Sequence, residues 1–479
     1  MTHTTRSPGR SPAPSREESI DRALQRVSDA PLRQGNRVTL LRNGPDTYGE
    51  WLAEIAGARK WVHLENYIFR GDAIGRHFAD ALSSKAREGV PVRVLYDWYG
   101  SKATPATHWR DLRAAGVEVR AFNPFAVQAP LEVFCRDHRK SLGVDGRYGS
   151  VGGVCIADRW TARSLKTGLG YRDTAVGFSG PVVADLERAF AQVWGRSGAA
   201  LPADELPRLE AIGEAGEQAA RLIIQEPAKM RVSRMLQIVS AGARERLWIA
   251  DAYFLAGPHL YQALMSAARD GVDVRLLLPA TNNLPIVSAM SRGSYRQLLE
   301  AGVQIFEYGG LMMHAKTSVV DGWSSRIGST NLNPTGLLNW EIDLIAEGRS
   351  FGAEMEEMFE EDLADSLPVR LDGFGRPKGE QRRRTPSKIR STLGSEGSGS
   401  RVAATAARTG AAMIRGEEEL RGYERTVAVT TSAGLLGVTL LGVRFPRSLA
   451  WPVAAATGLV GASGLLRSLR RRSPARGNG

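Results

Sequence analysis

The stretches HRKSLGVD at residues 138–145 and HAKTSVVD at residues 314–321 share one spacing of three polar residues. Residues two apart in an extended segment project to the same side, so the imidazole and the ammonium can meet one anion. Because the spacing occurs twice, we predict one two-part site for an anion, most simply a phosphate. The residues concerned are His138, Lys140 and Asp145 in the first copy and His314, Lys316 and Asp321 in the second.

The second copy continues after six residues into GSTNLN at residues 328–333. Small residues with hydroxyl and amide donors suit an oxyanion pocket. We therefore predict that Ser329, Asn331 and Asn333 bind phosphate. The corresponding stretch after the first copy, VGGVC at residues 151–155, has glycines and a cysteine instead.

With these motifs the sequence resembles the phospholipase D superfamily, in which two HxKxxxxD signatures, each followed by GSxN or GGxN, form one active site. The resemblance extends from Asn36 to about Leu367 and includes LENYIFRGD, VRVLYDWYGS, GYRDTAV and NWEIDLI. Within the superfamily the chain is most similar to bacterial cardiolipin synthases of the short type, without an N-terminal membrane anchor. The first copy departs from the pattern, with Cys155 in place of the usual asparagine and Ser141 in place of an apolar residue.

The resemblance implies a role for each histidine and lysine. His138 would attack phosphorus to form a phosphohistidine, while His314 would protonate the leaving alcohol and then act as base for the incoming one. Lys140 and Lys316 would neutralise the non-bridging phosphate oxygens. This chemistry needs neither a divalent metal nor another cofactor. The assignment of nucleophile to His138 rests on the resemblance alone.

The resemblance also implies that acidic residues orient the histidines crosswise. Glu341 in NWEIDLI would orient His138, and Asp173 in YRDTAV would orient His314. Asp145 and Asp321 would instead support their own motif's backbone and lysine. Other acids, Glu65 and Asp97, either line the site or cap strand ends. The remaining histidines lack a partnered lysine and are predicted to be non-catalytic: His63, His77, His108 and His259.

The fold prediction comes from a repeated order of strand, helix and strand. KWVHLENYIF, DAIGRHFADALSSKAREG and PVRVLYD form the first set, and RLWIADAYFL, GPHLYQALMSAARDG and VDVRLLLPA form the second. Such units predict a largely parallel sheet. We therefore expect an α/β fold of two phospholipase D-like α/β/α sandwich domains, produced by internal duplication.

Changes in composition set the expected domain boundaries. We predict a disordered N-terminus (1–35), a first domain (36–200), a linker (201–220), a second domain (221–367), a basic Gly/Ser-rich linker (368–412) and a membrane hairpin (413–479). The hairpin prediction rests on two uncharged runs, Thr426–Val443 and Ser448–Leu466, each near the length that spans a bilayer. Arginines outside the pair place both ends, and the catalytic domains, on the cytoplasmic side. Two apolar helices packed on the folded domains are the alternative.

The functional prediction is a phosphatidyltransferase that resembles cardiolipin synthase, joining two phosphatidylglycerol molecules and releasing glycerol. A hydrolytic phospholipase D is the first alternative. The net charge of +12 suits anionic phospholipids at a membrane and also nucleic acid, so a nucleic-acid phosphodiesterase is a more distant alternative, which the hairpin argues against. The last alternative is a non-catalytic membrane scaffold whose active site has lost its function. The sequence predicts no oligomeric state. The apolar stretch 123–134, NPFAVQAPLEVF, is a candidate lipid entrance.

Overall fold

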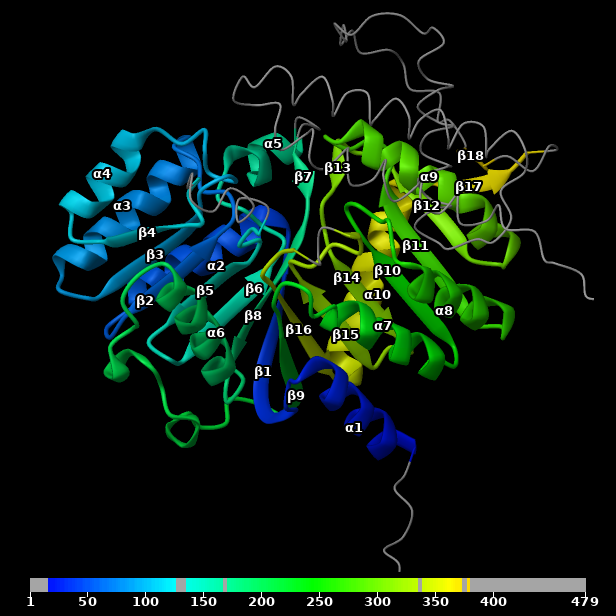
Figure 1. The fold of residues 1–479 in the computed structure, drawn as a ribbon, viewed down its shortest axis with the longest axis horizontal. Helices are drawn as coiled ribbons and strands as arrows, with labels where there is room; N and C mark the ends of the chain where they lie inside the picture. Colours follow the sequence, from blue (N-terminus) through cyan, green and yellow to red (C-terminus); the bar gives the residue numbers. More distant parts are fainter. Residues whose placement is uncertain (1–15, 126–134, 167–169, 335–337, 373–376, 380–479) are drawn as a thin grey trace, which may run out of the picture. The chain divides into compact units, whose positions relative to one another are not determined.

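The computed structural model describes residues 16–125, 135–166, 170–334, 338–372 and 377–379 (Figure 1). The first half consists of strands β1 (Arg33–Arg42), β2 (Val62–Asn66), β3 (Val92–Asp97), β4 (Glu118–Phe122), β5 (Lys140–Val144), β6 (Tyr148–Gly152), β7 (Tyr171–Arg172) and β8 (Thr174–Ser179), with helices α2 (Asn43–Gly57), α3 (Ala73–Arg87), α4 (Ala106–Ala114), α5 (Ala162–Lys166) and α6 (Val183–Arg196). The predicted strand, helix and strand correspond to β2, α3 and β3.

The second half repeats the alternation of strands and helices and the motif hairpin, and it adds β17 and β18. Its strands are β9 (Gln218–Gln225), β10 (Arg246–Ala250), β11 (Asp273–Pro279), β12 (Gln304–Tyr308), β13 (Met312–Met313), β14 (Thr317–Val320), β15 (Ser324–Gly328), β16 (Glu341–Glu347), β17 (Ser366–Leu371) and β18 (Pro377–Gly379), and its helices are α7 (Arg231–Gly242), α8 (Pro258–Arg269), α9 (Pro285–Glu300) and α10 (Arg349–Ala364). The duplication predicted from the sequence is therefore present as two equivalent α/β halves.

The two halves share one 16-stranded sheet, in which β1 and β9 pair across the boundary. Only the outer parts, β2–β3–β4 and β10–β11–β12, are parallel. The motif strands β5 and β14 run antiparallel to their neighbours. The prediction of a largely parallel sheet is therefore wrong, and the sheet is mixed. Asp-Gly pairs with positive φ, at 145–146 and 321–322, reverse the chain after each motif, as tight hairpins require.

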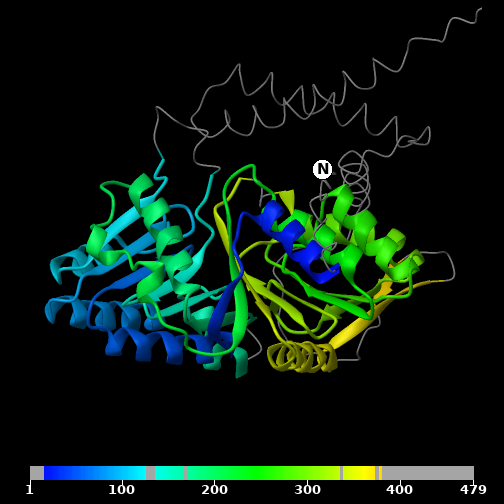
Figure 2. The ribbon, with the colours of Figure 1, turned by 90° about the horizontal axis from the view of Figure 1, so that it is seen from below.

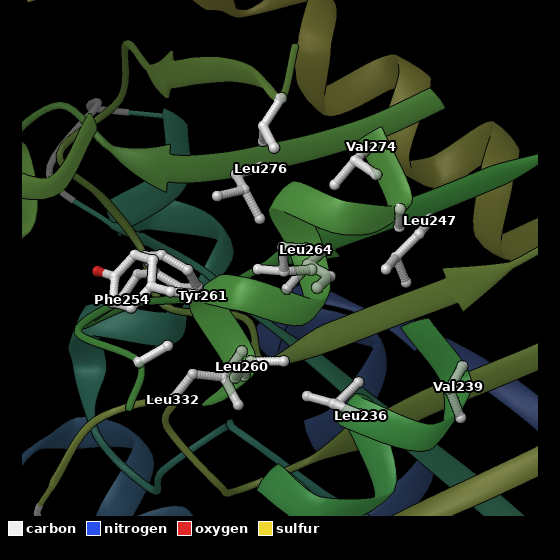
Figure 3. Packing of buried hydrophobic residues seen from close by; sticks show 14 of the residues in the cluster. Leu236, Val239, Leu247, Phe254, Leu260, Tyr261, Leu264, Val274, Leu276 and Leu332 are labelled. Carbon is white, nitrogen blue, oxygen red and sulfur yellow. The ribbon is translucent and has the colours of Figure 1, made fainter. Parts of the chain in front are cut away.

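Buried apolar residues form a core in each half, and residues of both halves make up a third cluster and a smaller fourth one. Trp51 and Phe78 lie in the first core, and α7 and α8 pack on β10 and β11 in the second through Leu236, Leu260 and Leu264 (Figure 3). The third cluster combines residues of both halves, among them Phe178 and Leu344. The halves therefore share buried packing as well as a sheet.

Several predicted boundaries shift in the structure. Helix α1 (Arg16–Ser28) and the start of β1 lie within 1–35, so the prediction of disorder is wrong for residues 16–35. Helix α1 lies beside α7 (Figure 2). Its Leu24 is buried in the core of the second half, and this packing stabilises the helix. The predicted linker 201–220 overlaps the first three residues of β9, which begins at Gln218, and the boundary at 367 falls inside β17.

The C-terminal predictions lie outside the described residues. Most of the basic linker, and the whole hairpin at 413–479, belong to the part of the chain that is not described. Within the described ranges, no helix combines the length and apolar character needed to cross a bilayer.

Candidate active site

The two motif copies approach each other through equivalent backbone contacts across the boundary of the halves. Met312–Met313 of β13, just before His314, pairs with Tyr171–Arg172 of β7 (Figure 1). Asp137, just before His138, forms the matching bridge with Trp340. The backbone N–H of His138 donates to the Trp340 carbonyl (2.9 Å), and that of His314 to the Arg172 carbonyl (2.6 Å). The residue directly after each of these carbonyl groups is acidic, Glu341 after Trp340 and Asp173 after Arg172, so each histidine lies beside an acid.

Each buried histidine contacts a carboxylate from the opposite half. His138 Nδ1 lies 3.0 Å from Glu341 Oε2, and His314 Nδ1 lies 2.6 Å from Asp173 Oδ2. Both carboxylates are completely buried. The crosswise contacts that the resemblance implies are thus present in the structure. They leave Nε2 of each imidazole as the nitrogen that can meet a substrate.

Burial sets the charge state of the histidine–acid pairs. It lowers the pKa of His138, with the charge of Lys140 adding to the effect. Burial and Lys316 lower the pKa of His314 to about 4. Burial would raise the pKa of Asp173, but its contact with His314 holds that pKa below the ordinary value. At neutral pH both imidazoles are therefore neutral beside ionised carboxylates.

The two lysines are fully buried next to the histidines of their motifs. Each ammonium donates to the carbonyl of the histidine two residues earlier, Lys140 to His138 and Lys316 to His314. Burial lowers the pKa of Lys316 to about 8, so it still carries a positive charge at neutral pH. The site thus holds two cations from equivalent strands.

The carboxylate oxygen that contacts each histidine also accepts a side-chain hydrogen bond, from a different type of residue in each half. Ser329 Oγ donates to Glu341 Oε2 at 2.6 Å. Gly153 is the equivalent residue, and a Cβ there would lie 2.1 Å from Asp173 Oδ1, so a serine does not fit. Trp160 Nε1 donates to Asp173 Oδ2 at 2.8 Å instead. Sequence reasoning missed Trp160, although a glycine in place of the serine already showed that one donor was absent.

The remaining predicted phosphate ligands differ in what they contact. Asn333 Nδ2 donates to the Tyr253 carbonyl at 3.2 Å, so this amide holds the loop in place. Asn331 is buried, and its Oδ1 has no hydrogen-bond partner. Cys155, its counterpart in the first half, is also buried, and burial raises the pKa of its thiol. Cys155 is therefore a neutral thiol at pH 7.

The motif aspartates act on the preceding strands. The carboxylate of Asp145 accepts hydrogen bonds of 2.7–3.1 Å from the backbone N–H groups of residues 59–61, before β2. Asp321 does the same for residues 244–246, at 2.9–3.3 Å. The prediction that they hold their own motif's lysine is therefore wrong. They fix the start of the strand beside the motif.

Other predicted residues have structural partners. Glu65 accepts from Ser141 Oγ at 3.0 Å, and Asp97 accepts from the backbone N–H of Gly100 at 2.8 Å. His63 is buried between Glu187 and Glu205, with ring nitrogens 2.6 and 3.2 Å from their carboxylates. Within the described ranges, no group of three or more His, Cys, Asp or Glu side chains is arranged to hold a metal ion. Independence from metals stays a prediction.

A duplicated α/β fold with two HxK motifs, each completed by an acid of the other half, defines a phospholipase D-type architecture. The family model described as "Cardiolipin synthase, PLD-like domain" matches residues 51–194 and 237–363. The chain therefore belongs to the cardiolipin synthase family with phospholipase D-like domains.

Individual relatives agree with this membership. A cardiolipin synthase of Geobacillus kaustophilus (strain HTA426) is 35% identical over 341 residues, which cover 70% of this chain and 67% of that protein. Cardiolipin synthase A of Pseudomonas fluorescens (strain SBW25) is 37% identical over 353 residues, covering 72% of each chain. A solved phosphatidylserine synthase of Haemophilus influenzae Rd KW20 has a similar fold, with a TM-score of 0.58 and 15% identity over 73% of this chain and 92% of that one.

Proposed function

We propose that the chain is a phosphatidyltransferase of the cardiolipin synthase type, which converts two phosphatidylglycerol molecules into cardiolipin and glycerol. The observation that carries this proposal is the pair of buried histidines, each held by a carboxylate of the opposite half, beside two buried lysines. Family membership narrows the substrate class to phospholipids. Exchange of one phosphodiester for another needs no nucleotide, since the bond energy is kept in a covalent intermediate.

In the proposed first step, His138 Nε2 attacks phosphorus and the bond to the glycerol oxygen breaks. His314 donates a proton to that oxygen, so glycerol leaves as a neutral alcohol. In the second step His314 takes the proton of a second phosphatidylglycerol hydroxyl, whose oxygen attacks phosphorus and displaces His138. Lys140 and Lys316 stabilise the charge on the non-bridging oxygens in both steps.

His314 must carry a proton for the first step, although its pKa in the protein is about 4. A phosphodiester anion beside the imidazole favours the charged form and raises that pKa. We infer that binding of the lipid headgroup is coupled to uptake of one proton from water by His314. The second lipid hydroxyl must then exclude water, because entry of water would give phosphatidic acid, the product of the hydrolytic alternative.

Location at a membrane follows from the same proposal. The uncharged runs at Thr426–Val443 and Ser448–Leu466 would anchor the chain as a hairpin, with the catalytic halves on the cytoplasmic side. The net charge of +12 suits a surface of anionic lipids. The same charge would serve nucleic acid, and steeply salt-dependent DNA binding would favour that alternative.

The test is mass spectrometry of lipids after purified full-length protein is incubated with phosphatidylglycerol vesicles. We expect cardiolipin and glycerol, both lost in His138→Ala and His314→Ala. Phosphatidic acid as the main product would replace the transferase with the hydrolase. No turnover, together with no trapped phosphohistidine, would favour a non-catalytic scaffold.

A further inference from the structure

Two buried asparagines in the described part of the chain have a side-chain oxygen without a hydrogen-bond partner. Asn66 lacks a partner for both Oδ1 and Nδ2, and Asn331 lacks one for Oδ1. Both side chains are nine-tenths or more buried. Buried polar groups in folded proteins are nearly always paired, so each exception calls for an explanation. Asn331 lies in the loop that the sequence predicts to bind phosphate, whereas Asn66 lies in β2, outside both motifs.

Asn66 lies at the end of β2, next to the first motif. It is directly opposite Lys140 in the antiparallel β2–β5 ladder, so the two side chains share one face with Cβ atoms about 5 Å apart. The next residue, Tyr67, places its ring 5.0 Å from Lys140 Nζ and 4.7 Å from the His138 ring. The unpaired amide therefore borders the histidine and lysine of the first half.

The same position in the second half carries Asp251. Glu65 pairs with Ser141 and Ala250 pairs with Thr317, each the third residue after its histidine, so Asn66 and Asp251 are equivalent. Asp251 is fully engaged, because its two oxygens accept the backbone N–H groups of Tyr253 and Leu332, both at 2.9 Å. It thereby holds the loop that carries Asn331.

Among the described residues, each half consequently has one buried asparagine whose side-chain amide oxygen lacks a hydrogen-bond partner, but at a different position. In the second half it is Asn331 of the motif loop, while in the first half the equivalent loop residue is Cys155, a weak hydrogen-bonding group. We infer that Asn66 replaces the missing loop amide as a substrate-binding residue. Its Nδ2 would donate to the phosphate oxygen held by Lys140, and its Oδ1 would accept from a hydroxyl of the glycerol headgroup. The identity of that headgroup rests on the proposed function.

The central test is Asn66→Leu, which keeps the branched arrangement of heavy atoms and removes both polar atoms. Since no protein hydrogen bond is lost, we expect the melting temperature to stay the same or rise. We expect kcat/KM for short-chain phosphatidylglycerol to fall about ten- to a hundredfold, as for loss of a hydrogen bond to a charged group. Asn66→Asp, which places a carboxylate beside the phosphate, should lose at least as much.

Two other asparagine-to-leucine variants serve as controls for Asn66→Leu. Asn36 is also buried, but its amide donates to the carbonyls of Arg33 (2.8 Å) and Gln218 (3.1 Å) and accepts the N–H of Val182 (3.0 Å). Asn36→Leu should therefore lower the melting temperature. Asn331→Leu should resemble Asn66→Leu, with activity lost and stability kept. Unchanged kcat/KM in Asn66→Leu, or a fall in melting temperature like that of Asn36→Leu, would overturn the inference.

A binding measurement separates this inference from the proposed function. Inorganic phosphate should raise the melting temperature of the wild-type protein, because it binds the folded site. If phosphate stabilises wild type and Asn66→Leu equally, Asn66 does not bind phosphate, whatever the lipid product. If wild type makes no cardiolipin but Asn66→Leu shows a smaller phosphate shift, the proposed reaction fails while the assignment of Asn66 holds.

Discussion

The two halves of the molecule use the same backbone contacts to build the site but satisfy its polar groups with different residues. In each half the histidine N–H donates to the carbonyl before the opposite acid, and the motif aspartate binds three backbone N–H groups before the neighbouring strand. The acid's second donor, however, is Ser329 in one half and Trp160 in the other. What stays equivalent is therefore the geometry of the histidine–acid pairs.

Buried charges also occupy different strands in the two halves. In the first half Arg139 Nε lies 3.5 Å from Glu65 Oε1 and 3.4 Å from Asp137 Oδ1. All three side chains are fully buried. The equivalent positions in the second half are the apolar Ala250, Met313 and Ala315. The second half instead pairs Arg326 with Asp343 at 2.8 Å, where the first half has Ser150 and Ala175. Each half of the sheet thus has buried ion pairs at positions where the other half has uncharged residues.

The largest expected losses of activity come from replacing the two histidines, and a second substrate distinguishes their roles. His138→Ala and His314→Ala should each lower phosphatidyl transfer by about a thousandfold or more, since each removes a group that acts in both steps. A diester with a good leaving group, such as p-nitrophenol, needs little acid catalysis. With that substrate, His314→Ala should still release nitrophenol and accumulate phosphohistidine at His138, detectable by mass spectrometry. Phosphohistidine at residue 314 of His138→Ala would exchange the two roles.

The next prediction concerns the buried ion cluster of Glu65, Asp137 and Arg139 in the first half. Arg139→Ala leaves two buried carboxyl groups without their cation and should cost about 3–5 kcal/mol of stability in urea unfolding. The triple variant Glu65→Ala, Asp137→Met, Arg139→Ala copies the second half. It should be far more stable than Arg139→Ala, because replacing a whole buried ion cluster by apolar residues is often neutral. Equal instability of both variants would show that the halves are not interchangeable here.

The sequence predicted which polar side chains lie together better than it predicted the direction of the strands around them. The motif spacing singled out both histidines and lysines, and the resemblance supplied Asp173 and Glu341 as the acids that contact the histidines. Their catalytic roles stay predictions. Sheet direction was misjudged because the strand and helix alternation covers only the outer strands, while Asp145–Gly146 and Asp321–Gly322 make hairpins in the middle. Trp160 and Asn66 were missed because their significance appears only when a distant partner, Asp173 or Lys140, lies beside them.

The unequal second donors give a matched pair of substitutions. Ser329→Ala and Trp160→Phe each remove one hydrogen bond from a buried carboxylate, from Glu341 and from Asp173 respectively. We expect each to lower kcat about tenfold, in line with loss of a hydrogen bond to a charged group. Because the acid orients a histidine and does not touch lipid, KM should change little. A change confined to KM in either variant would contradict the equivalence of the two donors.

The buried lysine of the second half should limit activity at high pH. Lys316 has a pKa of about 8, so its charge is present below that pH and is lost as the pH rises through it. We expect kcat/KM to decline with an apparent pKa near 8. Lys316→Arg, if active, should move this limb to higher pH, since arginine stays charged. A limb at the same pH in the arginine variant would assign it to another group.

Protonation of His314 should also make the free energy of unfolding depend on pH. The pKa of His314 is about 4 in the folded protein and about 6.5 in the unfolded chain. The unfolded state therefore binds more protons between these values, and the stability contributed by the neutral imidazole is lost as the pH falls from 6.5 towards 4. His314→Gln should flatten this dependence in urea titrations at several pH values. The same slope in the variant would place the proton uptake elsewhere.

The smallest expected effect tests whether apolar residues near the site meet lipid. Phe125 follows β4 at the start of the candidate lipid entrance and is 54% exposed, while Trp323, in the turn between β14 and β15, is 49% exposed. Phe125→Asp should lower turnover on vesicles about threefold to tenfold, as expected for an aromatic ring that leaves an apolar environment, without affecting short-chain soluble lipid. Trp323→Asp serves as the control because its turn follows Asp321, at the end of β14 away from His314. Equal losses on vesicles in the two variants would mean that neither loop is specific to the entrance, and no loss in Phe125→Asp would remove it from the path of the lipid.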